Sequence, residues 1–310
     1  MQSVVVPTLH SHGRKGTIET EQGAHLYFEY YRHPAEKAAV VIAHGFCEFT
    51  AKYEEFIFNF YQQGYSVYIM DLRGHGFSER KVSDPSKVHI DSYMEYVEDL
   101  HLFVTEVVMK NSKDTELVLF SHSMGGAVAG IYLEKHPDIF SCAILSSPML
   151  EIYLENFPIS IVGMLALIKK LLRQDTDYVP GHKPFNRKPK YLTSGCVSKA
   201  RYMYYFDKRL KQIRYYTYGA TYGWLWATIR ALRNVHKHAS EIKIPVLIMQ
   251  AGNDTVIKNS GQDKFASVNE RICICRFPEA KHEIYNADSD TRRIYYNKMF
   301  SFIETWRLPD

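Results

Sequence analysis

The sequence predicts an α/β fold with a doubly wound, mainly parallel sheet and an inserted, largely helical cap. Short apolar runs alternate with helical stripes over residues 38–148 and again over 241–306, which is typical of βαβ units. The alternation breaks between residues 149 and 240, where the chain is basic, aromatic and turn-rich. We therefore expect residues 1–148 and 241–310 to form one core and residues 149–240 to form a cap, or lid, set into it.

The first half of the core is expected to supply most of the strands. Residues 1–16 show no clear pattern and are expected to be loosely ordered. The predicted strands are 17–20, 25–31, 38–43, 65–70, 117–120 and 142–145. Three helices are predicted between these strands. The first spans 53–61 and is closed by Gly64, and the second begins at a Ser92–Glu95 capping box and runs from 93 to about 110. The third runs from the turn at Ser123 to about His136.

The cap and the second half of the core follow. Helical stretches are expected near 159–172 and 221–235, within the cap. The predicted core elements are strands at 245–250 and 271–277 and helices at 258–268 and 288–306. In the last helix, the side chains expected to contact the core are Ile294, Phe302, Ile303 and Trp306.

Composition indicates an ordinary globular protein. The chain has 310 residues, of which 46% are hydrophobic and 23% charged. Its five cysteines are scattered and form no Cys-x-x-Cys pair, which favours a reducing compartment over a disulfide framework. The N-terminus lacks a signal-peptide pattern, and the longest uncharged apolar run, 158–168, is too short to span a bilayer. We expect a cytoplasmic protein.

The positive charge is concentrated in the cap. Residues 151–240 contain 16 lysines and arginines and five acidic residues, whereas the remainder of the chain is net negative. Two interpretations stay open: a solvated surface, or peripheral contact with an anionic membrane surface. No nucleic-acid-binding motif accompanies the charge, so we expect no nucleic-acid partner. The sequence leaves the oligomeric state open.

Ser123 is the predicted nucleophile. It lies between an apolar strand and a helix that begins with Gly125 and Gly126, and such a strand–turn–helix corner exposes a serine hydroxyl near the positive end of the helix dipole. The usual pattern is Gly-x-Ser-x-Gly, but Ser121 replaces the first glycine here. The alternative is a glycine-rich turn with an incidental serine.

A serine nucleophile needs a base and a group that orients the base. The chain order Ser, acid, His points to Asp254, directly after the strand at 245–250, and His282, after the strand at 271–277. Asp263 and Asp288 are rivals, but both are expected to lie in or at the start of helices and to be solvated. The His122 side chain is expected to point away from the nucleophile.

The remaining catalytic groups are predicted to be backbone N–H donors. Met124 follows the nucleophile, and Phe46 follows His44-Gly45 after the strand at 38–43, so these two amides are expected to form the oxyanion hole. Residues 71–78 are expected to support this edge of the sheet. No metal-ligand spacing and no phosphate-binding glycine loop is present, so neither a metal nor a cofactor is expected.

These strings together resemble the bacterial lysophospholipase and monoacylglycerol lipase branch of the α/β-hydrolases. The matching strings are His44-Gly45-Phe46, Asp71-Leu-Arg-Gly-His-Gly-Phe-Ser78, Ser121-His-Ser-Met-Gly-Gly126, Gly252-Asn-Asp254 and His282-Glu283. The elbow without its first glycine, the cap stretch 221–226 and the ending His282-Glu-Ile-Tyr285 are most similar to the lysophospholipases. The resemblance implies an α/β-hydrolase sheet and hydrolysis of a carboxylic ester with a fatty acyl chain through an acyl-enzyme.

Several alternatives remain beside this hypothesis. The substrate class predicted first is lysophospholipid, with monoacylglycerol or a general carboxylic ester as the alternative. Trp224, Trp226 and the apolar run 159–168 are candidates for an acyl-binding channel, or the run is a helix packed on its own domain. A non-catalytic binding protein of the same fold is the more distant alternative, against which the intact Ser–Asp–His order argues. Serine at the elbow argues against an epoxide hydrolase or dehalogenase, which place aspartate there.

Overall fold

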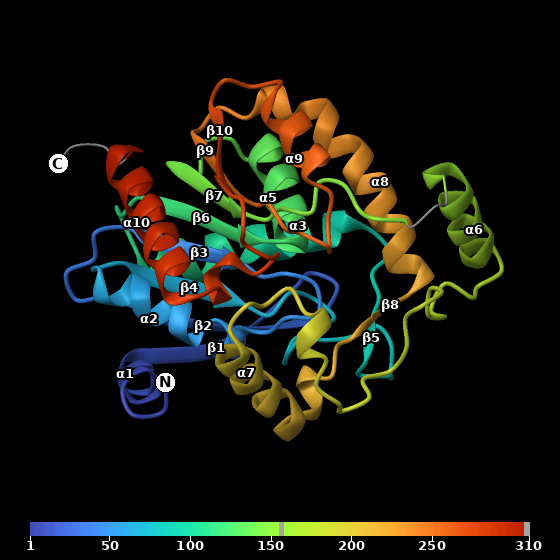
Figure 1. Ribbon diagram of the computed structural model, residues 1–310, viewed down its shortest axis with the longest axis horizontal. Coiled ribbons are helices and arrows are strands. Elements are labelled where there is room, and N and C mark those ends of the chain that lie inside the picture. Colours follow the sequence, from blue (N-terminus) through green and yellow to red (C-terminus); the bar gives the residue numbers. More distant parts are fainter. Residues whose placement is uncertain (155–157, 307–310) are drawn as a thin grey trace.

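An eight-stranded sheet forms the centre of the molecule (Figure 1). The computed structural model describes residues 1–154 and 158–306. In spatial order the strands are β1 (Gly13–Glu19), β2 (His25–Tyr31), β4 (Ser66–Met70), β3 (Ala39–Ala43), β6 (Leu117–His122), β7 (Cys142–Ser146), β9 (Val246–Ala251) and β10 (Ile272–Phe277). β1 and β2 pair antiparallel at one edge, and the strands from β4 to β10 are parallel. The predicted mainly parallel α/β sheet is confirmed.

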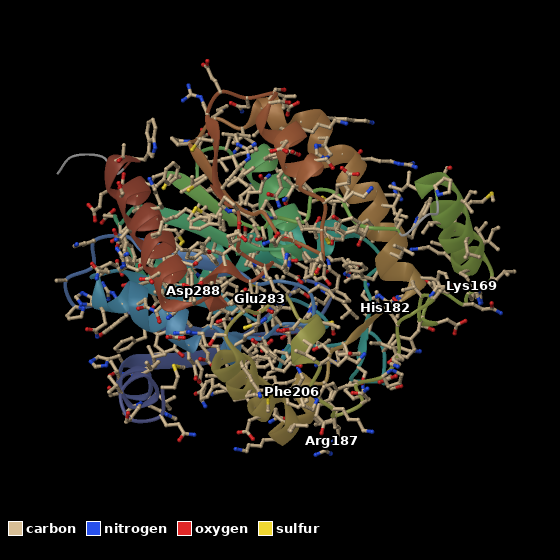
Figure 2. All side chains as sticks on the ribbon, in the orientation of Figure 1. Lys169, His182, Arg187, Phe206, Glu283 and Asp288 are labelled. Atoms are coloured by element: carbon tan, nitrogen blue, oxygen red, sulfur yellow. The ribbon has the colours of Figure 1, made fainter. Side chains whose placement is uncertain are left out.

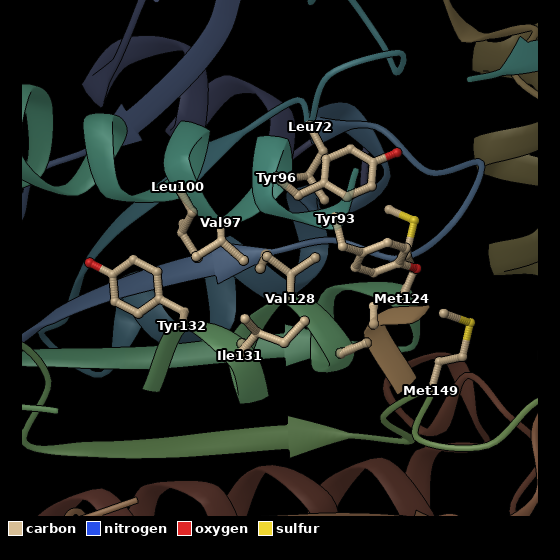
Figure 3. Packing of buried hydrophobic residues seen from close by; sticks show 14 of the residues in the cluster. Leu72, Tyr93, Tyr96, Val97, Leu100, Met124, Val128, Ile131, Tyr132 and Met149 are labelled. Atoms are coloured by element: carbon tan, nitrogen blue, oxygen red, sulfur yellow. The ribbon is translucent and has the colours of Figure 1, made fainter. Parts of the chain in front are cut away.

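Helices cover both faces of this sheet. They are α1 (Val5–His12), α2 (Glu54–Gln62), α3 (Tyr93–Phe103) with a π turn (Val104–Val108) and α4 (Met109–Asn111), α5 (Met124–Lys135), α6 (Ile159–Leu171), α7 (Lys199–Lys211), α8 (Tyr222–His238), α9 (Asn259–Ala266) and α10 (Ser289–Trp306). Successive strand side chains point to opposite faces. Accordingly Val41 packs in a cluster with α3 and α5, part of which Figure 3 shows, and Val40 and Ile42 pack in another with α2 and α10.

Most predicted core elements are present, with corrections at both ends of the chain. The Ser92–Glu95 capping box forms as expected. The expectation of loosely ordered residues 1–16 is wrong, because α1 buries Val5 and Leu9 in the cluster against α2 and β1 begins at Gly13. In α10, Ile303 is buried, but Ile294 and Trp306 are exposed. The helical period places Ile294 on the outer face, whereas Trp306 is exposed as the last residue of the helix.

The segment between β7 and β9 contains three helices among its described residues, and the sequence pattern predicted only α6 and α8. The missed helix, α7, buries an aromatic stripe of Tyr202, Tyr205 and Phe206 in a small cluster of its own, but its many lysines and arginines mask this stripe in the sequence. Its Arg201 binds Glu55 at 2.7 Å and its Lys208 binds Glu54 at 2.6 Å, both on α2. A second, two-stranded sheet pairs β5 (Lys87–Val88) with β8 (Gly219–Ala220). The domain boundaries at residues 148 and 241 stay a prediction.

Candidate active site

Ser123 lies at a sharp corner between β6 and α5. Its φ and ψ angles are 51° and −117°, a strained conformation for a residue with a side chain. The corner is crowded. A Cβ added at Gly125 would lie 2.1 Å from the carbonyl oxygen of Ala43, and one added at Gly126 would lie 2.4 Å from Cβ of Pro148. Only glycine fits at these two positions, which explains the small residues after Ser123.

Asp254 and His282 meet at the same edge of the sheet. They follow β9 and β10, and the carboxyl ends of parallel strands share one edge with the end of β6, where Ser123 lies. His282 Nδ1 is 2.7 Å from Asp254 Oδ2. Because an ionised carboxylate only accepts hydrogen bonds, Nδ1 carries the proton and Nε2 is left as the basic nitrogen.

The carboxylate of Asp254 is held in its ionised form. Burial alone raises its pKa, but the hydrogen bond from His282 and two backbone N–H groups bring the pKa below its ordinary value. Those backbone donors are Val256 at 2.8 Å and Ile257 at 3.1 Å, both to Oδ1. The rivals lie elsewhere: Asp263 pairs with Arg276, and Asp288 accepts the N–H groups of residues 290 and 291 at the start of α10.

His282 is held beside the elbow by several contacts. Its backbone carbonyl accepts a hydrogen bond of 2.8 Å from Ser147 Oγ. The ring of His122, the residue before Ser123, lies 4.8 Å from the ring of His282. His122 Nδ1 in turn is 3.1 Å from the carbonyl oxygen of Ser146, so its role is to pack against the imidazole and bind the backbone of β7.

The two predicted oxyanion donors lie on adjoining elements. Met124 is the first residue of α5, so its N–H is among those that a helix leaves without an intrahelical partner. Phe46 lies in the loop after β3. In this loop His44 Nε2 accepts the N–H of Leu72 at 2.9 Å, which leaves Nδ1 to donate to the carbonyl oxygen of Gly45 at 2.8 Å. Burial lowers the pKa of His44, which suits this neutral arrangement.

Residues 71–78 brace the same loop. The two carboxylate oxygens of Asp71 accept the backbone N–H groups of Thr50 at 2.7 Å and Phe77 at 2.8 Å. Burial nevertheless raises the pKa of Asp71 to about 7. Arg73 forms a buried, two-pronged pair with Asp99 on α3, at 2.9 and 2.6 Å. These contacts are internal to the scaffold, in line with a supporting function for the segment.

The sequence pattern missed a buried group of charges behind this loop. We call Glu48, Lys52 and Glu283 the ion cluster. Lys52 Nζ lies 2.5 Å from Glu48 Oε1 and 2.8 Å from Glu283 Oε1, and all three side chains are largely buried. Glu283, labelled near the middle of the view in Figure 2, is 9% exposed. The available signal was Glu48, an acidic residue only four positions after His44 in an otherwise apolar loop.

The two tryptophans of the predicted cap occupy different places. Trp224 is buried, and its ring lies 4.5 Å from that of Phe46, beside the predicted oxyanion loop. Trp226 lies under α6, where a Cβ at Gly163 is 3.9 Å from its ring. Apolar side chains on the outer face of α6 are exposed instead of packed. They are Ile159, Ile161, Met164, Leu165, Leu167, Ile168, Leu171 and the adjoining Leu172.

Neither a metal centre nor a membrane span is indicated by the described residues. His89, Asp91 and Asp175 lie close enough to share a cation, with ligand atoms within 4.8 Å of one another. Lys81 and Lys170 already pair with Asp91, however, and their positive charge opposes a cation there. Within residues 1–154 and 158–306, no helix combines the length and apolarity needed to cross a bilayer.

Comparison with known proteins gives a consistent family. The family model described as "Serine aminopeptidase, S33" (Hydrolase_4) matches residues 34–289. A probable lysophospholipase L2 of Haemophilus influenzae is 29% identical over 275 residues, which cover 85% of this chain and 84% of that protein. A monoacylglycerol lipase of Mycolicibacterium smegmatis is 25% identical over 254 residues, 81% and 82% of the two chains.

Solved structures agree on the fold. A soluble variant of the monoglyceride lipase of Saccharomyces cerevisiae, in complex with a substrate analog, superposes with a TM-score of 0.76 at 19% identity and covers 96% of both chains. A carboxyl esterase of Bacillus coagulans superposes with a TM-score of 0.77 at 19% identity, covering 95% and 98% of the two chains. The sheet and the helices around it are therefore those of an α/β-hydrolase.

Proposed function

We propose, since the chain belongs to the Hydrolase_4 (serine aminopeptidase, S33) family, that it is a serine hydrolase of carboxylic esters with a single fatty acyl chain. Lysophospholipid is the substrate class proposed first and monoacylglycerol the alternative, in line with the names of its relatives. One observation carries the chemistry: the Asp254–His282 hydrogen bond of 2.7 Å at the same sheet edge as the strained Ser123.

The proposed reaction proceeds through an acyl-enzyme. Ser123 Oγ attacks the ester carbonyl carbon while His282 Nε2 accepts the hydroxyl proton, and Asp254 stabilises the imidazolium that forms. The carbonyl oxygen becomes an oxyanion that the N–H groups of Phe46 and Met124 stabilise. His282 then donates its proton to the leaving alcohol, and the acyl group stays on Ser123.

The second half repeats these steps with water. His282 Nε2 takes a proton from a water molecule, which attacks the acyl carbon, and the collapse of the second tetrahedral intermediate releases a fatty acid and Ser123. Both halves need the same two donors and the same base. The supports for this assignment are the tautomer of His282 imposed by Asp254 and the N-terminal position of Met124 on α5.

The exposed face of α6 supports a proposal of peripheral membrane contact. Met164, Leu171 and Leu172 are 58%, 74% and 61% exposed, which is unusual for such large apolar side chains on one helix. Lys169, labelled beside α6 in Figure 2, and Lys170 lie on the same helix, where they are partly exposed and pair with Asp177 and Asp91. Apolar side chains with flanking cations suit an anionic bilayer surface, from which single-chain esters are drawn.

A substrate panel tests the proposed reaction. Wild-type protein should hydrolyse p-nitrophenyl butyrate and at least one of three lipids: lysophosphatidylcholine, lysophosphatidylethanolamine and monoacylglycerol. It should also react with a fluorophosphonate at Ser123. Ser123→Ala should lose the activity by several orders of magnitude, on the order of 10⁶-fold as for other serine triads. Because the family description includes aminopeptidases, an aminoacyl p-nitroanilide belongs in the panel. Preferred cleavage of that amide, or a folded and active Ser123→Ala protein, contradicts the proposal.

A paired variant tests the membrane contact separately. Leu171→Glu/Leu172→Glu should weaken co-sedimentation with anionic vesicles and reduce hydrolysis of vesicle-borne lysophospholipid. Hydrolysis of soluble p-nitrophenyl butyrate should stay near the wild-type rate, because the elbow is untouched. Equal vesicle binding by the variant and the wild type at low salt argues against α6 as the contact.

A further inference from the structure

The carboxylate of Glu48 is unusual because every acceptor position it has is used. Its Oε2 accepts the backbone N–H of Gly45 at 2.7 Å and the hydroxyl of Tyr53 at 2.6 Å. Its Oε1 accepts Lys52 Nζ at 2.5 Å and the hydroxyl of Tyr285 at 2.9 Å. A carboxylate has about four acceptor sites, so Glu48 is saturated. Its donors come from both sides of the proposed active site.

One side is the oxyanion loop. Gly45 directly precedes Phe46, and its N–H points to Glu48. The contact is close, because a Cβ added at Gly45 would lie 2.9 Å from Glu48 Oε2 and 3.1 Å from the His122 ring. Cys47, which follows Phe46, has a φ of 60°, a conformation that residues with a side chain rarely adopt. The loop is thus held in a strained shape that Glu48 helps to fix.

The other side is the segment that carries His282. Glu283, the next residue, accepts Lys52 through Oε1 and the side chain of Asn286 through Oε2 at 2.8 Å. Tyr285 binds Glu48 directly. A short segment of the cap covers this region: the N–H of Glu283 donates to the carbonyl oxygen of Gly195 at 2.9 Å, and the ring of Tyr205 lies 4.6 Å from Lys52 Nζ.

The charges are arranged for geometry more than for stability. Burial raises the pKa of Glu48, but Lys52 and the neighbouring hydrogen bonds bring it well below the ordinary value, and the pKa of Lys52 is raised by its two carboxylates. Glu48 and Lys52 are therefore both ionised. A buried ion group adds little stability compared with apolar packing of the same size, because desolvation offsets the attraction. It does impose fixed directions on every partner.

Resting on the proposed function, we infer that Glu48 is a positioning residue which, with Lys52 and Glu283, ties the Gly45–Phe46 oxyanion loop to the His282 segment. The oxyanion donor at Phe46 and the base at His282 come from segments more than 200 positions apart in the sequence. The ion cluster gives them a common anchor, so that both keep their places when charge develops on the ester oxygen.

Glu48→Gln is the test because it keeps the size of the side chain. A glutamine has one acceptor oxygen, so its NH₂ group must face either the Gly45 and Tyr53 donors or the Lys52 and Tyr285 donors. We expect kcat for p-nitrophenyl butyrate to fall about 10- to 100-fold, the range typical of lost supporting contacts, with KM within about threefold. Affinity for an alkyl trifluoromethyl ketone, whose adduct with Ser123 places an oxyanion at the same donors, should fall by the same factor.

Glu29→Gln is the matched control. Glu29 is also a carboxylate that accepts two tyrosine hydroxyls, those of Tyr27 and Tyr31, but it is partly buried and lies on β2, near the antiparallel edge of the sheet. It should lose some thermal stability while its folded fraction keeps the wild-type kcat and inhibitor affinity. Unchanged kcat and inhibitor affinity in folded Glu48→Gln overturns the positioning role, and so does an equal loss of kcat in Glu29→Gln.

A milder variant covers the case in which Glu48→Gln does not fold. Tyr285→Phe removes one donor to Glu48 without changing the charge, and kcat and inhibitor affinity should fall together by about 3- to 10-fold. No change in either overturns the inference. Failure of the proposed function is recognised separately, because wild-type protein then neither hydrolyses the ester nor reacts with the fluorophosphonate.

Discussion

Replacing Gly125 by alanine is predicted to lower kcat/KM about 100-fold, because the added methyl group strikes backbone atoms of the neighbouring strand. A Cβ at Gly125 lies 2.1 Å from the carbonyl oxygen of Ala43 and 2.7 Å from that of His44. Ordinary contact begins at 3.4 Å. The start of α5 and the end of β3 must therefore separate by roughly 1.3 Å, since neither backbone segment can rotate away as a side chain can.

That separation acts on the two proposed oxyanion donors. β3 leads into Phe46, and α5 begins at Met124, so the amides of these two residues move apart. Misplacement by about 1 Å costs on the order of 10²-fold in rate, equivalent to about 2.7 kcal/mol of transition-state stabilisation. The loss of one oxyanion donor falls in the same range. The measurement is kcat/KM for p-nitrophenyl butyrate, with circular dichroism to quantify the folded fraction.

Gly130→Ala provides the control on the same helix. Its Cβ meets Cγ2 of Val235 at 2.7 Å, which is the end of a side chain that can shift. The higher helix propensity of alanine adds about 1 kcal/mol to the free energy of unfolding, and overpacking against Val235 lowers it by about 1–3 kcal/mol. Stability should therefore change while kcat/KM stays at the wild-type value. A folded Gly125→Ala protein with wild-type kcat/KM, or an equal loss in Gly130→Ala, refutes the reasoning.

Three further predictions concern single residues. Asp254→Asn should reduce kcat by about 10⁴-fold, whereas Asp263→Asn should leave it near wild type, and the reverse order in ester hydrolysis assays means that the acid is misassigned. Burial lowers the pKa of His122 from 6.5 to about 4, so the unfolded chain binds the proton first as the pH falls. The free energy of unfolding in urea should therefore fall by up to about 3 kcal/mol through His122 between pH 6.5 and 4, and this fall should be smaller in His122→Gln. Parallel plots of unfolding free energy against pH for the two proteins contradict this. Leu9→Ala should cost about 2–3 kcal/mol if α1 is part of the core, and a change below about 0.5 kcal/mol in the same assay shows that it is not.

The sequence by itself determined the alternating core and the candidates for the chemistry. β3 and the first four residues of β6 are continuous apolar runs because both faces of a parallel sheet are buried, and such runs are visible in the sequence. Ser123, Asp254 and His282 follow predicted strands, and parallel strands bring their carboxyl ends to one edge whatever the connections between them. Local periodicity and chain order were sufficient for these predictions.

Only the tertiary structure decided which side chains meet across the chain. Lys52 and Glu283 are 231 positions apart, and Glu48 and Tyr285 are 237 apart, so no local pattern announces their contact. The exposure of Trp306 and of the outer face of α6 depends on where neighbouring elements end, as does the burial of α1. The spacing of apolar residues shows that a helix has an apolar stripe, but the packing of distant segments decides whether that stripe is covered. The same packing decides whether a buried charged side chain lies next to an opposite charge.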